Sequence, residues 1–120
     1  MRTPEMILKD LVSLEKEIRE VTDTLNALDD KDLEIEPEHR KMISELMNSD
    51  FIARLPNQAQ RDDALENYVL NNEQYRPLHY NYLKHKNTLK NTYRLYYFLQ
   101  DCMKNRRAEL QVITFGGRGE

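Results

Sequence analysis

The chain has 120 residues, of which 39% are hydrophobic and 32% are charged, with only three Gly and four Pro. This composition is typical of one helical domain, residues 1–120, and a second domain is not expected. No run of about 18 apolar residues is present and the start of the chain lacks the apolar core of a signal peptide, which favours a cytoplasmic protein with no membrane contact. The single Cys102 excludes an internal disulfide.

Charge is distributed unevenly along the chain. Residues 1–73 contain 9 Lys and Arg against 18 Asp and Glu, whereas residues 74–120 contain 9 against 3. The acidic N-terminal helices can lie along the basic C-terminal helix, within the chain or across a dimer. Alternatively, the basic face is free for nucleic acid or for an acidic protein.

A helix is predicted over residues 4–28. Thr3 offers a hydroxyl for the N-cap and Pro4 fits the first helical position. Apolar residues then follow in alternating steps of four and three, the heptad pattern of a coiled coil. This seam consists of Ile7, Leu11, Leu14, Ile18, Val21, Leu25 and Leu28. Such a narrow stripe needs one or two partner helices, and the C-terminal helix is long enough to pair with it antiparallel.

Residues 29–36 are predicted to form an acidic, solvated connector. The charged run 29–32 breaks the apolar pattern, and Pro37 disfavours a helical conformation of Glu36. His39, just beyond the connector, has no partner at metal-ligand spacing, and we expect it at the surface.

Two short helices are expected within residues 37–71. The first runs from about 37 to 47. The second runs from about 58 to 70, where Asn57 and Gln60 have the spacing of a capping box.

The longest predicted helix covers residues 72–110, beginning at Asn72 or Pro77. Steps of seven residues define its apolar seam, and the positions three further on are partly polar. The seam and companion positions are Tyr75, Leu78, Tyr82, His85, Leu89, Thr92, Tyr96, Leu99, Met103 and Leu110. Because a polar residue on a seam can set register and strand number, His85 and Thr92 favour a defined dimer.

Beside this seam lies a basic flank. Its cations alternate with tyrosines, a mixture found where a protein contacts phosphates and stacks on bases. The candidate contacts to a partner or to nucleic acid are Lys84, Lys86, Lys90, Arg94, Tyr97, Lys104, Arg106 and Arg107. Residues 111–120 follow as a tail, because residues 112–115 are β-prone and Gly116 and Gly117 disfavour a helix.

Catalytic chemistry is not indicated. His39, His79 and His85 show no metal-ligand spacing, and no serine lies in a strained turn beside a glycine-rich loop. Adjacent carboxylates such as those at positions 62 and 63 point in different directions on a helix. We therefore expect no catalytic residue, no metal, no cofactor and no enzyme activity.

One segment resembles a group of known proteins. An apolar residue precedes Leu55-Pro56-Asn57, and then come Arg61, an amphipathic helix, an Asn-rich break and a long helix rich in Tyr, Leu and Lys. This order, over about residues 51–107, resembles small helical accessory proteins of phages and prophages of gram-positive hosts. The resemblance implies a role in phage DNA metabolism or in countering host defence, within the host cytoplasm.

The elements together predict an all-α protein, an elongated helical bundle or coiled-coil hairpin with two long and two short helices. Two long seams expose more apolar stripe than one antiparallel pairing buries, so we expect a homodimer through the seam of either long helix. Coverage of the surplus by the short helices or by a foreign protein is the alternative.

Two functions remain open. The first is an accessory protein that binds and inhibits or modulates a host or phage protein, such as a nuclease or a defence complex. The alternative is a nucleic-acid-binding accessory factor of phage replication or recombination that uses the basic helix.

Overall fold

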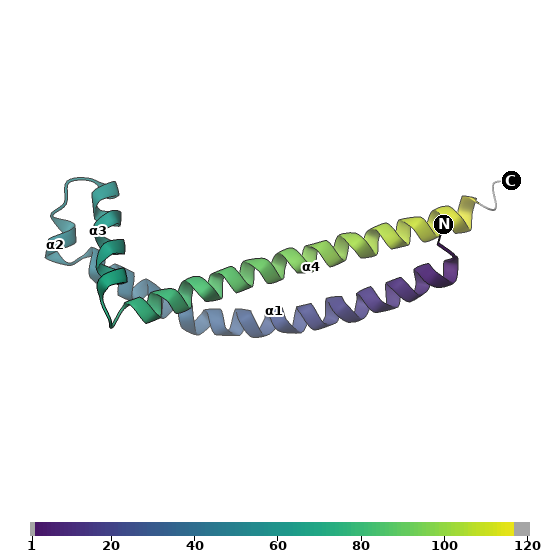
Figure 1. Ribbon diagram of the computed structural model, residues 1–120, viewed down its shortest axis with the longest axis horizontal. Coiled ribbons are helices and arrows are strands. Elements are labelled where there is room, and N and C mark those ends of the chain that lie inside the picture. Colours follow the sequence, from purple (N-terminus) through teal and green to yellow (C-terminus); the bar gives the residue numbers. More distant parts are fainter. Residues whose placement is uncertain (1, 117–120) are drawn as a thin grey trace. The chain divides into compact units, whose positions relative to one another are not determined.

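The computed structural model describes residues 2–116, and this part of the chain is all-α (Figure 1). Its helices are α1 (Pro4–Met47), α2 (Asp50–Ala53), α3 (Gln58–Asn71) and α4 (Arg76–Gly116). Within the described residues there are thus two long and two short helices and no strand. This confirms the all-α class that the periodicity of the sequence predicts.

The contacts of the chain gather in two compact units. The first unit combines Met1–Ala27 with Leu89–Glu120, and the second is Leu28–Thr88. The sequence predicted one domain without such a division. The boundary falls inside both long helices, so no linker sequence marks it.

The connector predicted at residues 29–36 is wrong, because α1 continues through it as a helix. The separate short helix predicted from about 37 to 47 is wrong for the same reason, since these residues are the end of α1. The heptad pattern in fact continues beyond Leu28, through Asp32, Ile35, His39 and Met42. Two polar residues at these positions conceal the pattern from a search for apolar residues. Residues 29–32 have a low helix propensity, but the packing of the continued heptad positions outweighs it.

Pro37 lies inside α1 and is exposed. A proline removes the hydrogen bond to the carbonyl four residues earlier, here the carbonyl of Leu33. Leu33 is itself exposed, so water can hydrate that carbonyl and the break in the helix ladder is tolerated.

The expected helix caps are present. Thr3 Oγ1 accepts a hydrogen bond from the Met6 amide at 3.2 Å, and Asn57 Oδ1 accepts one from the Gln60 amide at 2.9 Å. Asn72 Oδ1 accepts from the Tyr75 amide at 3.1 Å just before α4 begins. The short helix α2 was not predicted.

The predicted tail is wrong for residues 111–116, which continue α4. Ile113 follows Leu110 at the next seam position and is half-buried. Packing of this residue explains why the β-prone segment stays helical. The remaining predicted tail residues, 117–120, lie outside the described part of the chain.

In the first unit, the start of α1 and the end of α4 run antiparallel (Figure 1). Asp10 forms an ion pair with Arg106 at 3.4 Å, and Arg2 lies 3.7 Å from Glu109. Ile7, Leu25, Leu99 and Met103 are buried. The other seam residues of this unit are half-buried: Leu11, Leu14, Ile18, Val21, Leu89, Thr92, Tyr96 and Leu110.

The second unit has a more globular core. Met42 and Leu46 of α1 form a buried cluster with Ile52 of α2 and Val69 of α3. Ile52 is completely buried, although it belongs to a helix of only four residues. The short helices therefore give the second unit core side chains beyond those of α1 and α4.

Candidate functional site

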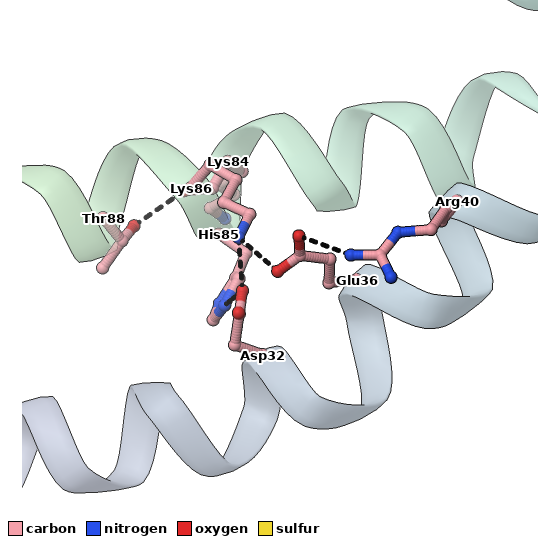
Figure 2. Close-up of polar contacts among 7 residues, drawn as sticks. All are labelled: Asp32, Glu36, Arg40, Lys84, His85, Lys86 and Thr88. Carbon is pink, nitrogen blue, oxygen red and sulfur yellow. Dashed lines mark hydrogen bonds and ion pairs between the residues drawn. The ribbon is translucent and has the colours of Figure 1, made fainter. Parts of the chain in front are cut away.

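A polar layer interrupts the seam of the second unit. His85 is 7% exposed, and its Nε2 donates a hydrogen bond to Oδ1 of Asp32 at 3.0 Å. Asp32 comes from α1 and His85 from α4, both at heptad positions (Figure 2). The sequence predicted a polar seam residue at position 85 but assigned its partner to a solvated connector.

Lys86 closes this layer on one side. Its Nζ lies 2.8 Å from Oδ1 of Asp32 and 2.9 Å from Oε2 of Glu36, and Glu36 also pairs with Arg40 at 3.1 Å (Figure 2). The hydrogen bond from Lys86 lowers the pKa of Asp32, and desolvation opposes this shift without cancelling it. The bonds to Asp32 and then to Glu36 raise the pKa of Lys86 above its ordinary value.

A stack of rings lies one to two turns away. His39 of α1 stacks on Tyr82 of α4 with ring centroids 3.6 Å apart, and its Nε2 lies 3.0 Å from Nδ1 of His79. Desolvation lowers the pKa of His39, and the neighbouring His79 lowers it further. The surface position expected for His39 is therefore wrong, because this ring packs between the helices.

These contacts are better suited to specifying how two helices pair than to catalysis. A hydrogen bond between Asp32 and His85 forms in one register only, whereas aliphatic side chains can slide past each other. Sequence reasoning could have found Asp32 and His39 by extending the heptad count through polar positions. Each lies seven residues from another seam position.

The predicted basic contacts divide into two groups. Lys86 and Arg106 are engaged in the ion pairs described above. The others are exposed and, within the described residues, take part in no ion pair. They are Lys84, Lys90, Arg94, Lys104 and Arg107.

On the outward side of α4 in the first unit, side chains form a strip at helical spacing. Lys90, Arg94, Tyr97, Asp101 and Lys104 follow one another in steps of four and three, so they share one face. All five are exposed. We call these five residues the α4 strip.

Apolar surface borders the α4 strip. Tyr97 and Phe98 are each 62% exposed, and Leu95 is 46% exposed. Tyr97 packs edge-on against Tyr96 with centroids 5.6 Å apart. An aromatic pair beside unpaired cations is the composition of a binding surface more than of a solvated helix face.

The described residues contain no group of three or more His, Cys, Asp or Glu side chains that is arranged to hold a metal ion. Among the same residues, none of the helices has the combination of length and apolar character that a bilayer span requires. No known protein family, curated protein or solved structure matches this chain.

Proposed function

We propose that this chain is an interaction protein, not an enzyme, which binds an acidic partner protein through the α4 strip. The observation that carries the proposal is the exposure of Tyr97 and Phe98 beside Lys90, Arg94 and Lys104. Aromatic side chains supply most of the binding energy in protein interfaces, and flanking charges select the partner and speed association.

The partner would be a host or phage protein, such as a nuclease or a defence complex, that is inhibited or modulated by binding. Support for this part comes from the resemblance of residues 51–107 to phage accessory proteins. A paired helix with an exposed aromatic strip matches a helix-in-groove mode of binding, in which side chains at positions i, i+3, i+4 and i+7 enter a groove of the partner.

Nucleic acid is the alternative partner, and Tyr97 among cations is the feature that favours it. Two observations make it the weaker candidate. Asp101 adds a negative charge to the strip between Tyr97 and Lys104, and Lys86 and Arg106 are neutralised by ion pairs. Fewer cations are then available to displace counterions from phosphates.

A homodimer also stays a prediction. Within each unit the seam residues of α1 and α4 belong to the same chain, so a dimer through the seam requires the two copies to exchange helices. A dimer through outward faces requires no exchange, and Met6, Leu8 and Val12 of α1 are apolar and exposed there. Light scattering at several concentrations distinguishes a mass near 14.4 kDa from twice that value.

The proposed function is tested with a pair of charge reversals. Lys90→Glu/Arg94→Glu alters the α4 strip, and Lys9→Glu/Lys16→Glu makes the same change of charge on exposed positions of α1 in the same unit. Each variant is used to capture proteins from a bacterial lysate, followed by mass spectrometry. We expect an acidic protein to be retained by the wild type and by the α1 variant and lost with the strip variant.

Retention by all three proteins would contradict the proposal. A duplex DNA mobility shift that weakens steeply between two salt concentrations, and that disappears in the strip variant, would support the nucleic-acid alternative instead.

A further inference from the structure

A groove of about 380 Å³ lies in the second unit, between α1, α3 and α4. Its apolar lining comes from Ile43 of α1, from Leu65 and Val69 of α3 and from Leu83 of α4. Val69 is 1% exposed and belongs to the buried cluster, against which Ile43 and Leu65 pack. The floor of the groove is therefore part of the folded core, and the groove exists before any ligand binds.

Leu83 marks the open side of this groove. It is 47% exposed, although it lines an apolar hollow. An aliphatic side chain left half in water beside buried apolar residues gains free energy when an apolar group covers it.

Two carboxylates form the rim on α3. Asp62 and Glu66 line the groove and are both exposed. The described residues place no cation in an ion pair with either of them, and Asp62 accepts a hydrogen bond only from the neutral amide of Gln58. Arg61, the single cation of α3, instead donates to the carbonyl of Leu55 at 3.4 Å.

The spacing of these carboxylates limits the shape of an occupant. Asp62 and Glu66 are four residues apart on a helix, so they are separated by about one turn, roughly 6 Å. Cations one turn apart on a second helix match this spacing. Side chains on one face of an extended strand repeat about every 6.6 Å, and the residues between them point to the opposite face. A strand therefore cannot present apolar groups from those intervening positions to the floor of the groove.

We propose that this groove binds a basic amphipathic helix of a partner protein. Leu or Met side chains of that helix cover Leu83 and the floor, and Lys or Arg side chains one turn apart pair with Asp62 and Glu66. The charge of this site is opposite to that of the α4 strip, so the second unit selects a different kind of surface from the one proposed for the first unit.

The test uses two labelled peptides of equal length, both helical and with the same leucines. One carries Lys and the other Glu at the flanking positions, and binding is measured by fluorescence anisotropy. We expect the Lys peptide to bind at least about tenfold more tightly than the Glu peptide, because two attractive pairs are replaced by two repulsive ones.

Matched variants of the protein test whether the peptide binds in this groove. Asp62→Lys/Glu66→Lys should reverse the preference, whereas Asp63→Lys/Glu73→Lys, the same charge change at exposed positions away from the groove, should leave it in place. Leu83→Ala should weaken the Lys peptide by about fivefold through lost apolar contact. Circular dichroism confirms that each variant is folded, and the mutated side chains are all exposed.

Equal binding of both peptides, or equal effects of the two charge-reversed pairs, would overturn the proposal. So would a wild-type dimer that Leu83→Ala converts to a monomer, since the occupant would then be a second copy of this chain. The α4 strip variant Lys90→Glu/Arg94→Glu should bind the Lys peptide normally, which keeps this result separate from the outcome for the proposed function.

Discussion

The two units use the same heptad spacing but different seams. In the first unit the buried positions are aliphatic or methionine, as at Ile7, Leu25, Leu99 and Met103. In the second unit, Asp32 and His85 replace such residues, and α2 and α3 complete a core. Apolar seams hold helices together without fixing their alignment, whereas a hydrogen-bonded pair has one productive geometry.

This difference suggests a division of tasks. We expect the apolar seam of the first unit to supply most of the free energy with which its helices pair, and the polar layer to set the register of α1 against α4 within the second unit. Burial of polar groups has a desolvation cost, so a polar layer lowers stability while it favours one alignment of the two helices.

The largest effect is expected from a charge in the apolar seam. Leu25→Asp places an unpaired carboxylate at a position that is 6% exposed, and it should lower the free energy of unfolding by about 3 kcal/mol. Chemical denaturation followed by circular dichroism measures the change. Asn26→Asp adds the same charge at the next, exposed position and should change the stability by less than about 0.5 kcal/mol.

The polar layer should respond differently to single and double changes. Asp32→Ala leaves the buried His85 without its hydrogen bond, at a cost of about 1–3 kcal/mol. His85→Ala removes the same hydrogen bond but leaves Asp32 paired with Lys86, so it should cost less. The double variant Asp32→Leu/His85→Leu should recover most of this loss, because leucines continue the apolar seam.

Register provides the second readout of the double variant. Cysteines introduced at facing positions of α1 and α4 in the second unit should form one set of disulfides in the wild type. In Asp32→Leu/His85→Leu the same cysteines should form several different disulfides, because the helices can then pair in more than one register. A double variant that is as unstable as the single ones, or that keeps one set of disulfides, would show that the layer does not set the register.

The part of α1 with an apolar seam could be predicted from the sequence, and the part with polar seam residues could not. Leu14, Ile18 and Leu25 reveal their helix because the first unit is packed with aliphatic residues, whose spacing can be read directly. The sequence pattern assigns Asp32 to a connector and His39 to the surface, because the sequence does not show that His85 and Tyr82 will face them. The groove could not be predicted, since Leu65 and Leu83 become neighbours only through the packing of α3 against the long helices.

A smaller effect is expected at the start of α3, which exists only in the second unit. Asn57→Ala removes the side-chain acceptor for the Gln60 amide and should cost about 1 kcal/mol. Hydrogen exchange should quicken at Val69 and leave Leu99 unchanged, since only the second unit contains this helix. Uniform acceleration along the chain would instead indicate that both units unfold together.

The smallest predicted effect concerns pH and is again confined to the second unit. The pKa of His39 is lowered from 6.5 by desolvation and by the charge of His79, so the unfolded chain binds a proton more readily than the folded one. Stability should therefore fall as the pH drops below about 6.5, and the loss should stop growing below the folded pKa. Protonation of both rings also removes the hydrogen bond between His39 Nε2 and His79 Nδ1, because neither nitrogen can then accept.

His39→Phe keeps a ring on Tyr82 and should lose less stability between pH 7.5 and pH 5 than the wild type, by about 0.5 kcal/mol. Asp32, whose pKa is lowered, keeps its stabilising contribution above the ordinary carboxyl range near pH 4 and loses it only at lower pH, so it does not obscure this interval. Identical pH profiles for the two proteins would show that His39 is not the group that links proton binding to folding.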